Sequence, residues 1–585
     1  MLSVGRWLAS ALAVQQWAHR HVFEAATARP AETQARVLER LLRANADTAF
    51  ARDHDLGGLP SPREYAQRVP VRDYEALRPY MSRVLAGEPR VLTAEAPLMF
   101  ATTSGTTAEP KFIPVTPTSA RQAAALMRLW TVHGLREHPA MLDRHVLTMV
   151  GPAVEGTTPG GAPHGAMTGM TYRRLPWLVR RRQALPYAVA LIRDHETRYF
   201  VAARLGLGHA VSSIGTPNAS TLLRLAETAA RRSEEVIRAI RDGVLGVDDV
   251  APIAGAEVSA TELRAALTAG LQPDGRRATE LSSVARVNGR LILGECWPEL
   301  ALVACWLGGS AGVQARHLDA HFPGVARRDL GLIASEGRLT IPLEDAAAAG
   351  VLAVHTTFFE FIAEEEVDDP APRPWLAHEL QDGRRYHVVI TGANGLYRYD
   401  LNDVVEVRGF HGRTPRVAFV RKGRDMLSIT GEKLHLNHVL HAVGAAARAT
   451  GLGVWQFRLI PDVEAARYDL LVEPTPAGLA SAPASFTTAF DRALSEVNIE
   501  YAAKRASSRL QAPRLFVMRP GWSERVCRAE IAGGRRESQH KWSALRPEWD
   551  ETSRRDVVRG LEHAAPCEVA SCPGPRGLRL SSWRR

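Results

Sequence analysis

Residues 102–116 read TTSGTTAEPKFIPVT, and this stretch constrains the fold more than any other part of the chain. Hydroxyl side chains surround Gly105, and Lys111 follows. Glycine lets the backbone approach an anion closely, consecutive N–H groups can line an anion-binding concavity, and a lysine supplies a positive charge. The apolar run at residues 97–101 is short enough for a buried strand. The stretch therefore predicts a strand that leads into a polyphosphate-binding loop.

This loop is not a Walker A loop. The pattern GxxxxGK[ST] needs a glycine directly before the lysine, and Pro110 stands in that place. A Ser/Thr-rich surface turn before a helix is the alternative at this point, because Ser, Thr and Gly are common loop residues. Other parts of the chain have to decide between the two interpretations.

Size and charge limit the class of protein. The chain has 585 residues, 45% of them hydrophobic, which is enough for more than one domain. The formal charge of +10 would attract an anionic ligand such as ATP. The arginines are interpreted as dispersed along mixed-charge helices such as residues 223–243, so no nucleic-acid partner is expected. Five cysteines without a CxxC pair argue against a disulfide scaffold or a zinc cluster and favour a cytoplasmic location.

The two ends of the chain carry no expected chemistry. Residues 1–21 fit an amphipathic helix that packs on the protein better than an export signal, because Gln15 and Gln16 interrupt the apolar run. No segment reaches the roughly 18 apolar residues of a membrane span, so no membrane partner is expected. Residues 549–585 have little apolar order and predict a disordered tail.

Two further stretches predict parts of a ligand site. Residues 329–337, DLGLIASEG, predict a strand that delivers Ser335 and Glu336 to a glycine turn, as at the carboxyl end of a strand in an open α/β sheet. A plain surface turn explains the same pair. Residues 388–407 predict two antiparallel strands joined by an Asn-Gly turn. Strands and helices alternate before residue 330, which indicates α/β layering.

Four separated motifs resemble the adenylate-forming superfamily of acyl-CoA synthetases, adenylation domains and luciferases. TTSGTTAEPK is similar to the phosphate loop [ST]SGTTGxPK, residues 329–337 to the strand that ends in a Ser-Glu pair beside the ATP, residues 395–407 to GLYRYRVGDVV, and residues 538–541 to NQYK. Residues 423–425 also resemble the interdomain hinge. The ending Glu-Pro-Lys and the following Phe-Ile-Pro-Val-Thr look more like one branch, the Gretchen Hagen family of acyl acid amido synthetases. That branch is known from plant hormone conjugation and is also present in bacteria. The chain is identified as a bacterial-type member, with the resemblance covering residues 35–548.

The resemblance implies a role for individual residues. It implies ATP phosphate binding by Thr103, Ser104, Gly105, Thr106, Thr107 and Lys111, nucleoside binding by Ser335 and Asp403, Mg²⁺ binding by Glu336, a hinge at Arg424 and Asp425, and catalysis by Lys541. Two positions depart from the family pattern. Asn402 replaces the glycine before the ribose-binding aspartate, and Asn is the least damaging substitute if φ is positive there. His540 replaces the aromatic residue of NQYK.

The resemblance also implies the architecture and the reaction. The expected fold is α/β, with a large adenylate-forming domain of layered α/β sheets at residues 1–423 and a small mobile α+β lid at residues 424–548. ATP and Mg²⁺ are the expected cofactors, and a small carboxylic acid and an amine, as in an amino acid, the expected substrates, with no obligate protein partner. The loop at residues 151–169, with Met167, Met170 and Leu175, is either part of the acid pocket or a mobile insertion.

Two alternative functions stay open at this stage. An adenylating ligase could transfer the acyl group to coenzyme A or another thiol, and the phosphates of coenzyme A would suit a basic surface. A non-catalytic relative could keep the fold and bind only nucleotide or acid, and the departures at Asn402 and His540 are consistent with that alternative.

Overall fold

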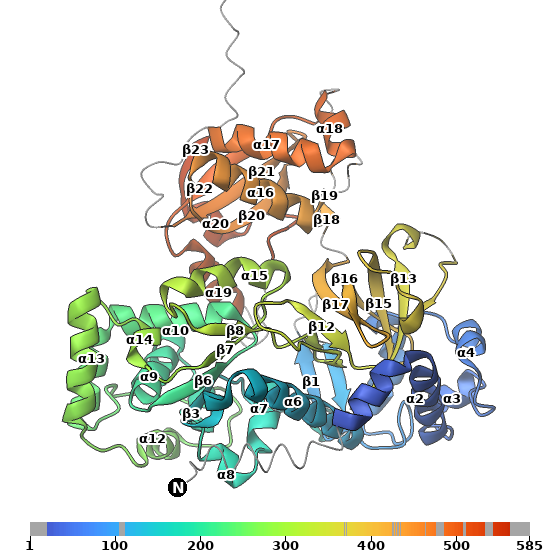
Figure 1. The fold of residues 1–585 in the computed structure, drawn as a ribbon, viewed down its shortest axis with the longest axis horizontal. Coiled ribbons are helices and arrows are strands. Elements are labelled where there is room, and N and C mark those ends of the chain that lie inside the picture. Colours follow the sequence, from blue (N-terminus) through green and yellow to red (C-terminus); the bar gives the residue numbers. More distant parts are fainter. Residues whose placement is uncertain are drawn as a thin grey trace, which may run out of the picture. The chain divides into compact units, whose positions relative to one another are not determined.

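The computed structural model describes residues 20–103, 111–367, 369, 371–423, 426–427, 429, 432, 434–462, 464–475, 485–506, 510–532 and 542–561. These residues divide into two compact units, which we call unit 1 (up to residue 423) and unit 2 (from residue 426 onward) (Figure 1). Both units combine helices with strands, and the predicted mixed α/β fold is confirmed. No helix in the described part of the chain is long and apolar enough to cross a membrane.

A four-stranded parallel sheet with order β3-β6-β7-β8 forms one layer of unit 1. Its strands are β3 (His145–Thr148), β6 (Val211–Gly215), β7 (Leu302–Ala304) and β8 (Ala326–Arg328). The segments around and between these strands carry α7 (Met167–Arg173), α8 (Trp177–Arg180), α9 (His195–Leu207), α10 (Ala219–Arg231), α11 (Ser233–Asp242), α12 (Ala260–Thr268), α13 (Gly275–Asn288), α14 (Leu293–Cys296) and α15 (Gly309–Ala315). Because the strands are parallel, their carboxyl ends meet at one edge, where such sheets bind ligands.

The second sheet of unit 1 has seven antiparallel strands, in the order β11-β12-β17-β16-β15-β13-β14. They are β11 (Thr340–Ile341), β12 (Ala349–Leu352), β13 (Phe358–Ala363), β14 (Trp375–Leu376), β15 (Arg385–Thr391), β16 (Tyr399–His411) and β17 (Thr414–Lys422). β15 and β16 are the two antiparallel strands that the sequence predicts around an Asn-Gly turn, so that hairpin is confirmed.

A third sheet, with order β2-β1-β5-β4, carries the predicted phosphate loop. Its strands are β1 (Met99–Thr103), β2 (Lys111–Val115), β4 (Gly156–Thr157) and β5 (Pro163–Gly165), and the helices before it are α2 (Pro30–Ala44), α3 (Ala49–Asp53), α4 (Pro62–Arg68) and α5 (Tyr74–Leu85). The helix α6 (Pro117–Glu137) follows β2 directly. It begins there because Thr116 and Ser119 form a capping box and Pro117 occupies the first turn.

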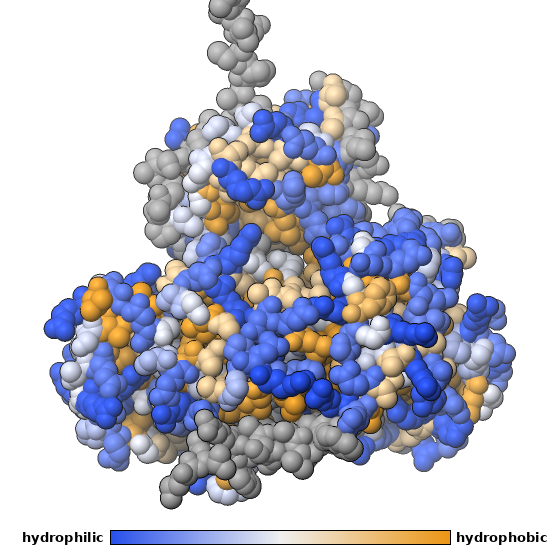
Figure 2. All heavy atoms as spheres, viewed as in Figure 1, coloured by the Kyte–Doolittle hydropathy of each residue, from blue (hydrophilic) through white to orange (hydrophobic). Residues whose placement is uncertain are grey.

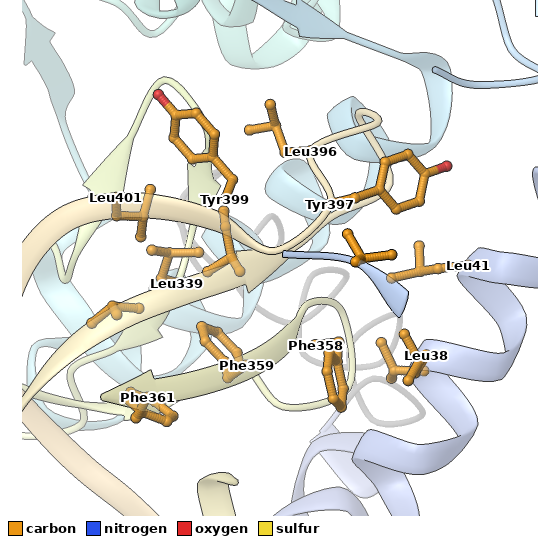
Figure 3. Packing of buried hydrophobic residues seen from close by; sticks show 14 of the residues in the cluster. Leu38, Leu41, Leu339, Phe358, Phe359, Phe361, Leu396, Tyr397, Tyr399 and Leu401 are labelled. Carbon is orange, nitrogen blue, oxygen red and sulfur yellow. The ribbon is translucent and has the colours of Figure 1, made fainter. Parts of the chain in front are cut away.

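The main hydrophobic core of unit 1 lies between the N-terminal helices and the seven-stranded sheet (Figure 3). Leu38 and Leu41 of α2 lie beside Phe358 of β13, and Tyr397 and Tyr399 from the β15–β16 hairpin belong to the same cluster. All five side chains are at most 4% exposed. Each such apolar side chain contributes about 1.5–3 kcal/mol when it leaves water. The hairpin that carries several predicted site residues is therefore rooted in this core.

Unit 2 contains a four-stranded sheet with order β20-β21-β22-β23 and a two-stranded β18–β19 pair. The strands are β18 (Met426–Leu427), β19 (Leu434–His435), β20 (Val454–Asp462), β21 (Arg467–Pro474), β22 (Arg514–Met518) and β23 (Val557–Leu561). The helices are α16 (Leu436–Thr450), α17 (Ser485–Val497), α18 (Ile499–Ala506), α19 (Trp522–Ala532) and α20 (Glu551–Arg555).

The prediction of a disordered tail from residue 549 is wrong for its first part. Asp550 caps α20, and the buried Ser553 accepts a 2.8 Å hydrogen bond from the Trp522 indole. β23 then pairs with β22 as an edge strand. Strand pairing and helix capping order this segment although it has few apolar residues. Residues 562–585 lie outside the described part of the chain.

The face drawn in Figure 2 is largely hydrophilic, with apolar residues scattered between charged ones. Each unit instead has its own buried apolar cluster, for example around Phe457, Phe486 and Phe490 in unit 2. Scattered apolar residues on a surface are normal and need no special explanation.

Candidate functional site

The strands β1 and β2 fix the base of the predicted phosphate loop. Thr103 and Lys111 face each other in the antiparallel register, so the loop begins and ends at one point. Residues 104–110, which include the predicted site residues Ser104, Gly105, Thr106 and Thr107, lie outside the described residues. The fully buried Thr102 hydroxyl donates to the Gly165 carbonyl of β5 at 3.3 Å, which ties the strand before the loop to its other neighbour.

The Lys111 ammonium lies at this base without an ion pair in the described part of the chain. Its Nζ is 5.7 Å from the centre of the Tyr74 ring, and the Tyr74 hydroxyl accepts a 3.0 Å hydrogen bond from the Phe112 N–H. The lysine is half-buried. The ring quadrupole attracts the cation without neutralising its charge. The arrangement therefore suits phosphate binding at the end of the loop.

Ser335 and Glu336 occupy a different kind of turn from the one expected. Ala334 of β9 (Ile333–Ala334) pairs antiparallel with Gly337 of β10 (Gly337–Arg338), so Ser335 and Glu336 form the two-residue tip of a hairpin. The predicted strand before Ser335 and the glycine turn after Glu336 are confirmed, but the expectation that this strand belongs to the open α/β sheet is wrong, because β9 pairs only with β10 among the described strands. The parallel strand β8 ends at Arg328, and the chain then leaves the sheet and turns back on itself.

The Glu336 hairpin is held by the β15–β16 loop. The Asn394 amide donates a 3.0 Å hydrogen bond to the Glu336 carbonyl. The Tyr399 hydroxyl hydrogen-bonds to the Glu336 carboxylate, and burial together with that negative charge raises the pKa of Tyr399 well above its usual value. Glu336 has no ion pair among the described residues, so its carboxylate is open to a cation.

The same loop also contacts the strand that follows the phosphate loop. The Thr116 hydroxyl, directly after β2, donates a 3.0 Å hydrogen bond to the Ala393 carbonyl. Ala393 and Asn394 are neighbours, so one loop reaches both the phosphate-loop hairpin and the Glu336 hairpin. Three of the sequence motifs therefore meet within unit 1.

Asp403 lies farther along β16, four residues after Tyr399. It is 2% exposed and faces Lys422 in the β16–β17 register. The preceding Asn402 has φ +54°, the left-handed conformation that the family glycine would adopt easily. The condition stated for Asn402, a positive φ, is therefore met, and Asn tolerates the left-handed region better than other non-glycine residues do. Its N–H donates to Asp400 Oδ1 at 2.7 Å, which supports the turn.

The remaining predicted residues have no described position. Arg424, Asp425 and Lys541 lie outside the described residues, so the hinge and the catalytic lysine stay predictions. The exact domain boundary after residue 423 stays a prediction as well.

The predicted acid-pocket region is more ordered than the sequence indicates. Residues 151–169 contain β4 and β5, and Met167 and Met170 pack against the main core of unit 1. A small pocket lies nearby at the carboxyl end of β3. None of the three predicted residues lines it; its lining consists of Thr148, Met149, Val150, Tyr172, Leu185, Pro186, Val189, Ala190 and Arg198.

Sequence reasoning missed Asp329, which follows β8 at the carboxyl edge of the parallel sheet. Its Oδ2 accepts from the Leu307 N–H at 2.6 Å and its Oδ1 from the Gly331 N–H at 2.5 Å. Arg338 of β10 donates to the carbonyl of the residue after this aspartate at 2.7 Å. Burial raises the pKa of Asp329 to about 6. Asp329 and Arg338 together brace the base of the hairpin that carries Glu336. A carboxylate directly after a parallel strand was the available signal.

Sequence reasoning also assigned no role to Arg398. It has φ +44°, and its Nε donates to the Glu360 carboxylate at 2.9 Å. Its Nη1 donates to the carbonyls of Ala66 and Val69, each at 2.7 Å. This arginine joins the helix α4 and the segment after it to the β15–β16 hairpin, which is a structural role.

A magnesium ion fits Glu336 better than the other carboxylate cluster of unit 1. Mg²⁺ takes one or two protein carboxylates and completes its shell with phosphate and water oxygens. The other cluster consists of Glu137, His138 and Asp345. The fully buried Arg328 guanidinium pairs with Glu137 and with Asp345, the latter at 2.8 Å, so this cluster is an ion-pair network. Glu336, in contrast, has no cation beside it in the described part of the chain.

Models of one protein family match most of the chain. Residues 19–326 match the GH3 family N-terminal domain, residues 350–422 the GH3 family central domain and residues 437–546 the GH3 family C-terminal domain. Jasmonoyl-L-amino acid synthetase JAR4 of Nicotiana attenuata is 25% identical over 447 residues, which cover 73% of this chain and 75% of that enzyme. Indole-3-acetic acid-amido synthetase GH3.2 of Arabidopsis thaliana is 25% identical over 446 residues, 73% of this chain and 80% of that enzyme.

Solved structures share the fold. The structure of GH3.15 acyl acid amido synthetase aligns with a TM-score of 0.80 at 21% identity, covering 93% of this chain and 97% of that one. A 2-hydroxyisobutyryl-CoA ligase in the postadenylation state aligns with a TM-score of 0.52 at 14% identity, covering 89% and 90%. At these identities the two structures support the fold alone.

Proposed function

Because the chain belongs to the GH3 family, we propose that it is an ATP-dependent acyl acid amido synthetase. It adenylates a small carboxylic acid and then transfers the acyl group to the amine of an amino acid. The observation that carries this proposal is the meeting of three motifs in unit 1. One loop bonds the strand after the phosphate loop through Thr116 and the Glu336 hairpin through Asn394.

In the first half-reaction, a carboxylate oxygen of the acid attacks the α-phosphorus of ATP, and pyrophosphate leaves. The loop from Thr103 to Lys111 holds the polyphosphate, with Lys111 as its cation. Asp403 accepts hydrogen bonds from the ribose hydroxyls, since a carboxylate has two oxygens for two vicinal donors. Ser335 contacts the nucleoside beside it.

Glu336 is the residue proposed to hold Mg²⁺. The bound ion would neutralise phosphate charge and orient the polyphosphate. The residues of the chain do the rest of the positioning: Asn394 fixes the backbone of the hairpin, and the Tyr399 hydroxyl orients the Glu336 carboxylate.

In the second half-reaction, the amine attacks the carbonyl carbon of the acyl-adenylate, and AMP leaves.

We place Lys541 at the α-phosphate in the first half-reaction, where negative charge builds up as one anion attacks another. Residues 424–548 act as a lid that turns about Arg424 and Asp425 between the two half-reactions.

The finer assignments concern the acid, the branch of the family and the location. The named relatives are synthetases of jasmonoyl-L-amino acid and of indole-3-acetic acid amides, and the acid of this chain is proposed as a small carboxylic acid. The chain is proposed to be a bacterial-type member of the family, and its identity to these plant enzymes is only 25%. A cytoplasmic location is proposed from cysteine usage.

The test is ATP–pyrophosphate exchange with Mg²⁺ and a panel of aromatic and aliphatic acids, without any amine. Exchange with one group of acids supports adenylation and names the acid class. AMP release is then compared with amino acids and with coenzyme A as acceptors. Faster release with coenzyme A would replace the amide proposal by a thioester one, and silence across the panel would favour a non-catalytic relative.

A further inference from the structure

One part of unit 1 is far more basic than its surroundings. Residues 156–193 contain no Asp or Glu but six arginines: Arg173, Arg174, Arg180, Arg181, Arg182 and Arg193. The interpretation that arginines are dispersed along mixed-charge helices is wrong for this segment, because five of the six fall within ten residues.

Apolar side chains lie in the middle of this basic segment and face solvent. Trp177 and Leu178 open the single-turn helix α8 and are 57% and 42% exposed. Arg174 precedes them, Arg180 and Arg181 follow them, and all three are exposed. Figure 1 draws α8 at the lower edge of unit 1. We call residues 173–181 the α8 patch.

The α8 patch is anchored to the protein on both sides. The buried Tyr172 hydroxyl donates to the Leu185 carbonyl at 2.7 Å. Arg182 donates to the carbonyls of Leu142 and Arg144 at 2.7 and 3.0 Å. The exposed tryptophan and leucine are thus presented on a fixed turn.

The charges of the patch are not compensated within the described part of the chain. Some exposed arginines elsewhere pair with carboxylates, as Arg231 does with Glu196. No such pair is found in the described residues for the arginines of the patch; the Arg181 guanidinium lies 5.5 Å from the centre of the Trp177 ring. A fixed cluster of unpaired cations attracts a polyanionic partner.

The apolar pair decides which polyanion fits. Tryptophan is favoured at the boundary between lipid and water, and arginines beside it contact anionic headgroups. An acidic protein or a nucleic acid would use the arginines but leave the exposed leucine without a role. We propose that the α8 patch is a contact surface for an anionic lipid bilayer, with Trp177 and Leu178 at the acyl boundary and the arginines at the headgroups. The proposal does not depend on the proposed function.

The experiment is co-sedimentation of the full chain with phosphatidylcholine vesicles, with and without about 30% phosphatidylglycerol. Binding is expected only to the anionic vesicles at 0.1 M salt. It should fall at 1 M salt, because the screening length shortens from about 10 to about 3 Å. Equal binding to both vesicle types would overturn the electrostatic part of the proposal.

Two variants separate the contributions. R180Q/R181Q should lower the partition coefficient by about 25-fold, since each arginine near an anionic surface is worth about fivefold. W177A/L178S should also lower it, which a purely ionic partner would not require. Thermal unfolding should be unchanged, because all four side chains are exposed.

Matched controls test whether the effect is local. R276Q/R408Q removes the same charge from exposed sites elsewhere, and V287S removes a 78%-exposed apolar side chain from α13. Both should bind vesicles like the wild type. Loss of vesicle binding in either control would overturn the proposal. Full vesicle binding by W177A/L178S, together with displacement of the vesicles by single-stranded DNA or polyglutamate, would also overturn it.

Discussion

Two buried carboxylates in unit 1 are held in opposite ways. The Glu360 carboxylate receives a direct 2.9 Å ion pair from Arg398, whose guanidinium also bonds two carbonyls. Asp329 instead accepts hydrogen bonds from the backbone N–H groups of Leu307 and Gly331, at 2.6 and 2.5 Å. Both carboxylates are at most 3% exposed. The first joins distant parts of the fold, and the second fixes the loops at the edge of the candidate site.

Burial raises the pKa of both carboxyl groups, although Arg398 opposes the shift at Glu360. Burial raises the pKa of Asp329 from 3.8 to about 6, so at neutral pH the fold carries an ionised group at a cost of about 3 kcal/mol. Enzymes commonly contain residues near the active site that lower the stability of the fold but hold the site in its active geometry. The comparison therefore predicts that the Glu360 pair matters for stability and that the residues near Asp329 matter for activity.

The largest expected effect is on stability, for Arg398→Met. Removing the guanidinium leaves Glu360 as an unpaired buried charge, which should lower the free energy of unfolding by about 3–5 kcal/mol. Denaturant unfolding followed by circular dichroism measures it. R276Q, which removes an exposed pair, is the control. Equal changes in the free energy of unfolding for Arg398→Met and R276Q would contradict the stabilising role of the Arg398–Glu360 pair.

Lys111→Ala should have the next largest effect, and on activity alone. Adenylation should slow by about 10²–10³, the scale for losing one electrostatic stabiliser, while the melting temperature stays unchanged because the lysine is only half-buried. Exchange kinetics at saturating acid measure the rate. R121A, which removes an exposed cation from the start of α6, should react like the wild type. An unchanged exchange rate in Lys111→Ala would remove the lysine from the site.

Asp329→Asn should change how stability depends on pH. The folded-state pKa is raised, so the stabilising contribution of the protonated form is complete below about pH 4 and is lost as the pH rises through about 6. The variant lacks this loss. The difference in unfolding free energy between variant and wild type should therefore shift by up to about 3 kcal/mol in favour of the variant between pH 4 and 7. A constant difference would contradict the burial of an ionised Asp329.

Asn394→Ala should have the smallest effect. It removes the hydrogen bond to the Glu336 carbonyl, worth about 1 kcal/mol, and should raise the KM for ATP about fivefold. Asn288→Ala removes hydrogen bonds to the Val284 carbonyl within α13 and to Glu295, away from the candidate site, and serves as the control. If both variants change only stability, the link between Asn394 and the site fails.

Local patterns in the sequence predicted the parts of the site that lie close together in the chain. The strand before the phosphate loop and the β15–β16 hairpin follow from a few adjacent residues, whereas the conditional expectation for Asn402 rests on the family pattern. Turn chemistry and strand periodicity act at that range.

Contacts between distant residues were beyond the sequence patterns. Thr116 and Ala393 are 277 residues apart, and Asn394 and Glu336 are 58 apart. The edge strand at residues 557–561 was missed for the same reason, since its pairing partner is β22.

The most direct test of the central claim follows the oxygen atoms of the acid. Carboxylic acid labelled with oxygen-18 in both carboxyl oxygens is incubated with ATP, Mg²⁺ and the accepting amine, and the AMP is analysed by mass spectrometry. Because a carboxylate oxygen attacks the α-phosphorus and stays on it when the amine displaces AMP, each AMP formed should carry one labelled oxygen. Unlabelled AMP, or label in inorganic phosphate together with ADP, would contradict adenylation.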